Sequence, residues 1–257
     1  MQGSTAAAGK RTAGLSRFVA LWVAAFTLLA GSTILPAREA SPFGSPLANF
    51  FSRNEQPLKQ YRALRRMHAA ADKGGHEAWL EAWTELKDGR FSYDVISERG
   101  SDTVRCKVLR ATLEREQELV NNGDSQKADL TSANYEFGEA SRDSAGRQVV
   151  QIKPKRSDVL LVDGHAVLDE GGELVRVEGK LSKNPSFWTS LVNIVRRYAR
   201  IGGVRVPVAT ETTAKVKFVG AAQMQVVYDY ESVNGRAVSL SERRSTSPLH
   251  SAEQSGW

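Results

Sequence analysis

Hydrophobic and polar residues alternate along most of the segment 148–234, which is the pattern of β-strands. In 204–208, three valines alternate with Arg205 and Pro207, and the segments 214–218 and 224–230 alternate in the same way. A period of two places one face of each strand against an apolar core and the other face in solvent. The segment therefore predicts a sheet with one apolar face and one wet face.

Turn residues separate the alternating runs at short intervals. The expected strands are 135–140, 147–153, 158–162, 165–168, 173–179, 187–201, 204–210, 212–219 and 224–232, and Asp163-Gly164 is one of the expected turns. Such short links favour an antiparallel meander over βαβ units. Because so large a sheet must twist and curl, its apolar face is expected to become concave.

Two helices are expected ahead of this sheet. Ser52 and Glu55 fit a capping box for a first helix, which would end at Gly74-Gly75. The apolar face of this helix would consist of Leu58, Tyr61, Leu64, His68 and Ala71. A second helix is expected over 103–120, with Cys106, Leu109, Leu113 and Val120 along its buried stripe. Cys106 is expected to be a small buried apolar residue.

The segment 78–86, between the two helices, fits a helix or a strand, because Trp79 and Trp83 share one side under either period. The Asp88-Gly89 turn and the alternation in 91–98 favour a β-hairpin. The predicted fold class is thus α+β and mainly β. It is a curled antiparallel sheet, an incomplete barrel, with helices covering the concave face.

The first 40 residues have the parts of an export signal. Lys10, Arg11 and Arg17 precede an apolar run, 18–30, and small residues follow it. The run is shorter than the ~20 residues that a membrane-spanning helix needs. It indicates a signal peptide and an exported protein, with an uncleaved N-terminal membrane anchor as the alternative. We expect 41–54 to be a linker, 55–237 the folded domain and 238–257 a disordered tail.

Charge and composition narrow the classes of function. The net charge is +6, of which about half lies in residues 1–40. The rest of the chain is nearly balanced in charge, so nucleic-acid binding, which needs a concentrated basic surface, is not expected. The single cysteine excludes an intramolecular disulfide. The four histidines are scattered, and the sequence contains no Gly-x-Ser-x-Gly motif. We therefore expect no metal, no cofactor and no enzyme activity.

Several segments resemble one bacterial family. They are FSYDVISERGSD (91–102), VLRATLEREQEL (108–119), SANYEF (132–137), the whole of 150–207, and the strand containing Tyr228-Asp229-Tyr230. Over roughly 78–236 the chain is similar to the outer-membrane lipoprotein-sorting protein-like family, a poorly characterised group within the LolA-like lipoprotein-carrier superfamily. The resemblance implies an incomplete β-barrel in the periplasm, with helices plugging its mouth and a cavity that accepts acyl chains. It brings no catalytic residues.

The expected function is binding or carriage of acyl chains, from a lipid or an acylated protein, with transient membrane contact. Candidates for the cavity lining are the apolar residues of the concave face: Phe91, Tyr93, Val206, Val216, Phe218, Met224, Val226 and Tyr228. Candidates for the lid or rim are Trp79, Trp83, Phe187 and Trp188.

Two alternatives stay open at this point. The first is an envelope protein-interaction or sensor module on the same scaffold. The docking contacts of such a module would come from two basic groups, Arg62, Arg65 and Arg66 in one, and Arg196, Arg197 and Arg200 in the other. The second is a hydrolase with an unrecognised site, which no residue pattern nominates.

Overall fold

The structure is a computed structural model that describes residues 45–74, 76–187, 189–217 and 220–246. The strands of this part of the chain are β1 (Tyr61–Ala71), β2 (Glu77–Lys87), β3 (Arg90–Gly100), β4 (Tyr135–Arg142), β5 (Gln148–Pro154), β6 (Val162–Leu168), β7 (Leu174–Leu181), β8 (Thr189–Ile201), β9 (Val204–Val216), β10 (Gly220–Val233) and β11 (Arg236–Ala237). The helices are α1 (Pro46–Ser52), α2 (Asp102–Val104), the π-helix η1 (Arg105–Arg110), α3 (Ala111–Asn121), the 3-10 helix η2 (Ser125–Ala128) and α4 (Leu240–Thr246).

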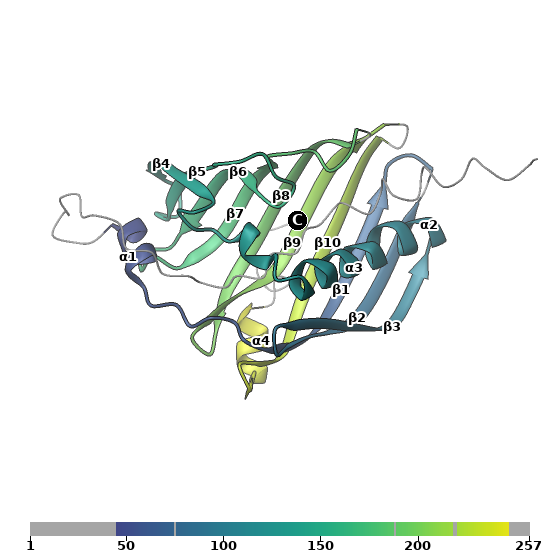
Figure 1. Ribbon diagram of the computed structural model, residues 1–257, viewed down its shortest axis with the longest axis horizontal. Coiled ribbons are helices and arrows are strands. Elements are labelled where there is room, and N and C mark those ends of the chain that lie inside the picture. Colours follow the sequence, from purple (N-terminus) through teal and green to yellow (C-terminus); the bar gives the residue numbers. More distant parts are fainter. Residues whose placement is uncertain (1–44, 75, 188, 218–219, 247–257) are drawn as a thin grey trace, which may run out of the picture.

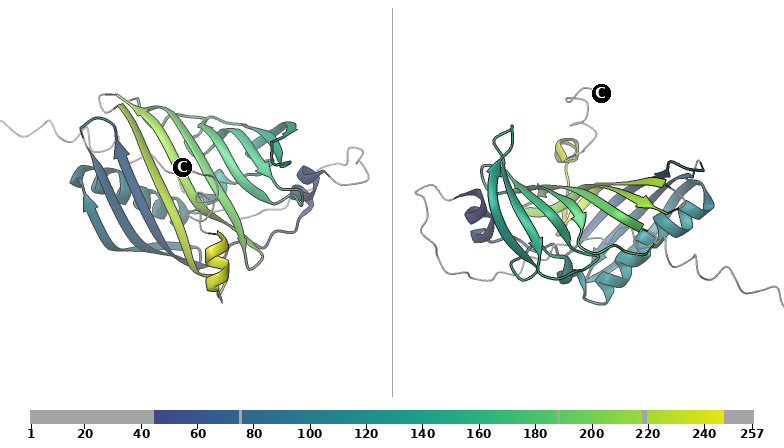
Figure 2. Two further views of the ribbon diagram at one scale, coloured as in Figure 1. Left: turned by 180° about the vertical axis from the view of Figure 1, so that it is seen from behind. Right: turned by 90° about the horizontal axis from the view of Figure 1, so that it is seen from above.

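Antiparallel pairing joins all the described strands into one sheet, with the order β3-β2-β1-β10-β9-β8-β7-β6-β5-β4 and β11 paired to β10. Strands β4 to β10 follow one another as a meander, as do β1 to β3, and β1 pairs with β10 to join the two runs. The sheet curls without closing into a barrel, and α3 lies across its concave side (Figures 1 and 2). The predicted fold class is confirmed.

The first expected helix is wrong, because its residues form β1 in the middle of the sheet. Alternate residues of β1 are buried in the pattern of a strand with one inward face. Ala, Leu, Arg and Met dominate this segment and favour helices. In addition, Arg65 occupies an inward position, which conceals the apolar alternation. Pairing with β2 and β10 on both sides decides the conformation, since tertiary context overrides local propensity.

The structure also tests the predictions of a hairpin, of a turn and of the bounds of one strand. The hairpin predicted over 78–98 is confirmed as β2 and β3, with Asp88 in a left-handed conformation at the turn (φ 52°). The turn expected at Asp163-Gly164 is wrong, because both residues lie inside β6. The expected strands 204–210 and 212–219 form a single strand, β9, which the structure describes to Val216.

The second predicted helix is confirmed as the continuous helical run of α2, η1 and α3. Leu109, Leu113 and Val120 are buried as expected. Cys106 is exposed, so the expectation of a buried cysteine is wrong. The reason is the π-helical turn. The wider turn rotates the side chains away from the phase of an ideal α-helix.

Both faces of β9 are covered over residues 204–210, all of which are buried. The expectation that Arg205 and Pro207 face solvent is therefore wrong. Arg205 lies with its guanidinium 5.0 Å from the ring centroid of Phe50 in α1, and its Nη1 is 3.7 Å from Glu55 Oε1. α1 and the segment after it thus cover this part of the sheet, although 41–54 was expected to be a linker.

The terminal segments add two short helices. Residues 46–52 form α1, and within the expected tail 240–246 form α4, where Arg243 lies 3.8 Å from Asp229 of β10. No helix in the described part of the chain is long and apolar enough to span a membrane. The expected signal segment, 1–40, lies outside the described residues.

Candidate functional site

An apolar cavity of about 120 Å³ lies where the ends of β1, β9 and β10 meet the start of the helical run. It is lined by Ala69, Ala70, Ala71, His76, Thr103, Val104, Val108, Val216, Ala222 and Gln223. Ala69 and Val104 are buried, whereas His76, Thr103 and Gln223 are exposed. The cavity therefore has an apolar interior and a mouth marked by polar side chains.

Small side chains create this space. Ala69 and Ala71 of β1 stand in register with Met224 and Ala222 of β10, so most of the sheet floor is alanine at this point. The opposite wall is formed by Val104 of α2 and Val108 of the π-helical turn. Methyl groups below and branched side chains above leave a gap that neither element fills. Empty cavities lined by such groups are dry and accept apolar ligands.

Elsewhere beneath α3 the concave face is filled. Phe91, Met224, Val226 and Tyr228 are all buried in the main core. The Oγ1 of Thr112 in α3 lies 4.0 Å from the sulfur of Met224, and Asn121 accepts a hydrogen bond of 2.8 Å from the backbone N–H of Phe91. These four predicted lining residues pack against the helix and do not line the cavity.

A buried ion pair holds α3 to the sheet. Arg65 of β1 and Glu116 of α3 pair through the two terminal guanidinium nitrogens, with Nη2 at 2.7 Å from Oε1. The same Nη2 donates to the hydroxyl of Tyr61 at 2.7 Å. The Arg65 guanidinium also lies over the rings of Phe91 and Tyr228, at 5.1 and 4.7 Å. Burial works to lower the pKa of Arg65, but Glu116, Tyr61 and Tyr228 together outweigh it, and the pKa is raised well above its usual value. Burial raises the pKa of Tyr61.

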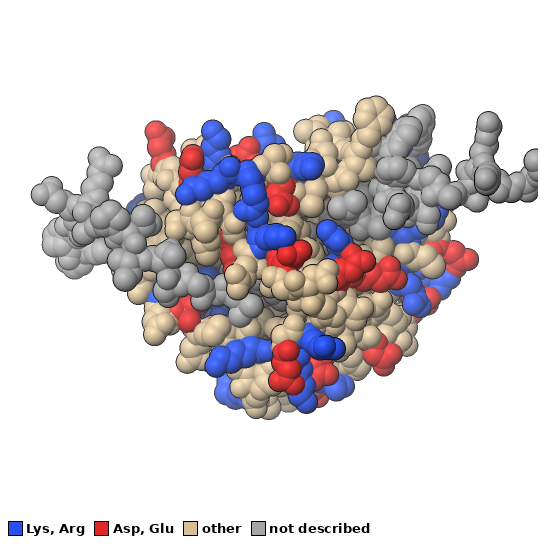
Figure 3. Space-filling model, viewed as in Figure 1, with Lys and Arg blue, Asp and Glu red and all other residues tan. Residues whose placement is uncertain are grey.

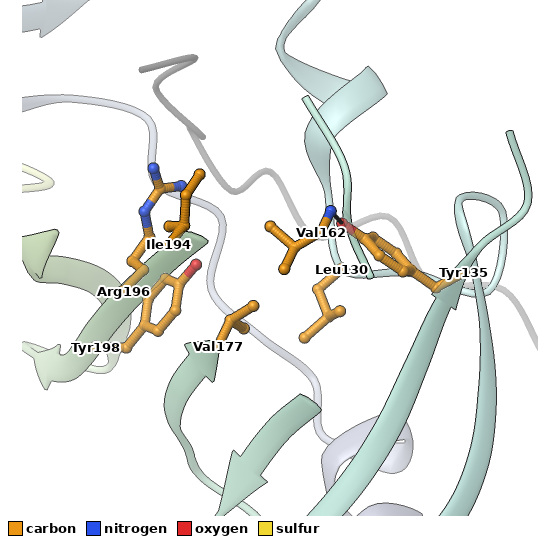
Figure 4. A pocket seen from close by; sticks show the side chains of 7 residues that line it. All are labelled: Leu130, Tyr135, Val162, Val177, Ile194, Arg196 and Tyr198. Atoms are coloured by element: carbon orange, nitrogen blue, oxygen red, sulfur yellow. Dashed lines mark hydrogen bonds between the residues drawn. The ribbon is translucent and has the colours of Figure 1, made fainter. Parts of the chain in front are cut away.

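A second, much smaller cavity of about 20 Å³ lies under the other half of the sheet (Figure 4). Its lining residues are Leu130, Tyr135, Val162, Val177, Ile194, Arg196 and Tyr198. The Tyr135 hydroxyl accepts a hydrogen bond of 3.1 Å from the Val162 N–H, and Arg196 Nε donates to Thr210 at 3.2 Å. This volume holds about one water molecule, so this cavity is too small for an organic ligand.

A wide, open groove of about 580 Å³ lies at the opposite end of the sheet from the alanine-lined cavity. Its lining mixes apolar residues such as Leu58, Leu86 and Val120 with polar ones such as Lys59 and Asp88. Where described residues are seen on the face shown in Figure 3, basic and acidic side chains are interspersed. Neither the groove nor this distribution of charges favours the binding of a particular ion. In the described residues, no group of three His, Cys, Asp or Glu side chains is placed to hold a metal.

The remaining predicted site residues are dispersed. Val216 lines the alanine-lined cavity, Tyr93 is half-buried on β3, and Val206 is buried within the core. Phe218 and Trp188 lie outside the described residues. Phe187 is 79% exposed in the loop before β8.

The two tryptophans of β2 lie on the outer face of the sheet, since the inward positions of this strand are Ala78, Leu80 and Ala82. Trp79 stacks on His68 at 4.9 Å and Trp83 lies under Arg62 at 4.6 Å. Both indoles are therefore far from the position of a lid. The residues that sequence reasoning missed are the alanines of β1 and β10, whose only signal is their small size.

Comparisons with known proteins do not identify a family for this chain. No family model matches the sequence, and no curated protein matches it. Among solved structures, the crystal structure of a LolA superfamily protein from Nitrosomonas europaea is similar, with a TM-score of 0.36 and 11% sequence identity. The likeness covers 76% of this chain and 93% of that chain. A TM-score this low carries no argument about the family or the ligand.

Proposed function

We propose that this protein binds the end of an acyl chain, from a lipid or an acylated protein, in the alanine-lined cavity, and that it does so in the periplasm without a catalytic step. One observation carries the proposal. The cavity has a wholly apolar interior of about 120 Å³ and exposed polar residues only at its mouth. An amphiphile with a slim apolar tail and a solvated head fits that arrangement.

The size of the cavity sets the expected affinity. By proportion to a cavity of roughly 150 Å³ that binds benzene, it holds about five carbon atoms. At about 0.8 kcal/mol per buried CH₂ this contributes about 4 kcal/mol, which corresponds to a dissociation constant of about 1 mM. Tighter binding then requires α2 and η1 to move away from the sheet, so that more of the chain is buried.

The test is to fill the cavity and measure uptake of a fluorescent fatty acid, dansyl-undecanoic acid. Ala222→Leu places a larger side chain in the floor of the cavity, and we expect it to weaken binding by tenfold or more, since it excludes several methylene groups. The matched control is Ala140→Leu, at an exposed position of β4, which should bind as the unchanged protein does. Circular dichroism checks that both variants are folded.

Native mass spectrometry of the protein purified from a periplasmic fraction identifies what it carries. Co-purified phospholipid or acylated peptide, lost in Ala222→Leu and kept in Ala140→Leu, supports the proposal. An apo mass together with no uptake of the fluorescent fatty acid contradicts it. Recovery of the protein in the cytoplasmic fraction alone contradicts the proposed location.

A second candidate is an envelope protein-interaction module, favoured by the packed interior beneath α3. Its docking contacts differ from those expected from the sequence, because Arg65 and Arg196 are buried. Arg62 and Arg66 are exposed on the outer face, where Arg62 pairs with Glu231 at 2.7 Å and Arg66 with Glu81 at 3.3 Å. If the unchanged protein takes up no fatty acid and is recovered with an apo mass, this candidate replaces the first.

A further inference from the structure

The end of the sheet that holds the alanine-lined cavity also carries an exposed apolar and basic surface. The loop between β7 and β8 reaches this end, where Thr189 of β8 pairs with Val216 of β9, a lining residue of the cavity. Phe187 in this loop is 79% exposed, and Leu191 is 53% exposed. Single exposed apolar side chains are common on protein surfaces, so what these two can bind depends on the residues around them.

Leu191 is held in this exposed position by an unusual backbone. Its φ is 51°, in the left-handed region that disfavours residues other than glycine and asparagine, and it lies at an irregularity in the pairing of β8 with β9 between Ser190 and Asn193. A glycine at this bulge would avoid the strain. Local strain of this kind is found at functional sites, and here it directs an apolar side chain into solvent.

Lysines surround the two apolar residues. Lys217 Nζ lies 3.8 Å from the ring centroid of Phe187, and Lys215 stands opposite Ser190 in the β8–β9 pair. Lys183 lies in the same loop as Phe187, and Lys73 approaches Gly220 at the start of β10. Lys73, Lys183 and Lys215 form no ion pair within the described ranges. Of the carboxylates on the neighbouring β1–β2 turn, Glu77 is engaged by His68 at 2.7 Å, and Asp72 adjoins Lys73.

We propose that Phe187, Leu191 and the four lysines form a docking surface for an anionic lipid bilayer. The apolar side chains would enter the headgroup region, while the lysines contact acidic headgroups, as in other interfacial membrane anchors. Charge complementarity selects this partner, because the described residues of this surface combine net positive charge with two exposed apolar side chains. The mouth of the alanine-lined cavity would then open towards the membrane.

A probe at one position tests insertion directly. In the full chain carrying Cys106→Ser, Phe187→Cys is labelled with an environment-sensitive fluorophore and mixed with vesicles of equal parts phosphatidylcholine and phosphatidylglycerol. We expect a blue shift of emission, which is absent with pure phosphatidylcholine. The matched control is Ile96→Cys on β3, where the native side chain is 49% exposed. Because the fluorophore reports only the surroundings of position 187, binding of the vesicle through the N-terminal apolar run alone does not give this spectral shift.

Substitutions give the size of each contribution. Lys183→Gln and Lys215→Gln should each lower the vesicle partition coefficient about fivefold, since one lysine at an anionic surface contributes about 1 kcal/mol. Lys59→Gln and Lys87→Gln, exposed at the opposite end of the sheet, should change nothing. Leu191→Asn tolerates the left-handed backbone and should lower partitioning about tenfold.

Two results would overturn the proposal: an equal spectral shift at positions 96 and 187, or no shift at either with anionic vesicles. The proposal is independent of acyl binding. Ala222→Leu is expected to bind vesicles normally even though its fatty-acid uptake is lost, so the failure of one proposal is distinguishable from the failure of the other.

Discussion

The backbones of β6 and β7 approach unusually closely at a facing pair of glycines. Gly164 and Gly179 are register partners. A Cβ atom added at Gly164 would lie 2.1 Å from the carbonyl oxygen of Glu178 and 2.6 Å from the Cα of Gly179. Backbone atoms cannot rotate away as a side chain can. The strand pair therefore requires glycine here, which explains why a dipeptide typical of turns occurs inside a strand.

Gly164→Ala is expected to lower the free energy of unfolding by about 3 kcal/mol, because the added methyl group forces the two strands apart. Gly138→Ala on β4 is the matched control, since its Cβ would meet only the flexible side chain of Gln151, and it should lose less than about 1 kcal/mol. Urea unfolding followed by tryptophan fluorescence measures both. Equal losses in the two variants would contradict the steric explanation.

At the scale of elements, the Arg65–Glu116 pair decides how α3 is held. Both side chains are at most 4% exposed, and removal of one partner leaves the other charge buried without compensation. Glu116→Ala is therefore expected to lower the free energy of unfolding by about 3–5 kcal/mol. The exposed pair Arg115–Glu118 on the same helix supplies the control, Glu118→Ala, which should lose less than about 1 kcal/mol.

The double variant Arg65→Met, Glu116→Leu separates the buried charge from the packing. Replacement of both partners by apolar residues of similar volume should restore most of the stability. If the double variant is no more stable than Glu116→Ala, the stability of α3 depends on the hydrogen bonds of this pair and not on the avoidance of a buried charge.

Sequence patterns predicted elements wherever one physical signal dominated. The valine alternation of β9 and the leucine stripe of α3 were sufficient to identify these elements. β1 was missed because Arg65 occupies an inward position in a segment of strong helix formers. The cavity could not be predicted, since Ala69 of β1 and Ala222 of β10 are distant in the chain. In addition, small side chains create space only when the side chains packed above them do not fill it. The positions of the two tryptophans of β2 could not be predicted, because a spacing of four residues places them on one side of the strand without showing whether that side faces inward or outward.

At the scale of the whole molecule, the pairing of β1 with β10 joins the ends of the domain, with Tyr61 opposite Val233. Without β10, the unit formed by β1 to β3 has no strand to pair with on the side where β4 to β9 lie. A chain that ends after residue 216 should therefore show no cooperative unfolding transition by circular dichroism, whereas a chain that ends after residue 246 should unfold as the full chain does. A cooperative transition in the shorter chain would show that β4 to β9 form a stable unit alone.

The failure of the sheet to close has a mechanical consequence. In a closed barrel, the strand number and shear fix the radius, so the interior can widen only if strands separate. Here β3 and β4 are the edges of the described sheet and are not joined to each other. The curvature of the sheet can therefore increase or relax while every strand keeps its neighbours. If the proposed function is right, we expect a longer acyl chain to be accommodated as the sheet bends away from α2 and η1, with the backbone ladders intact.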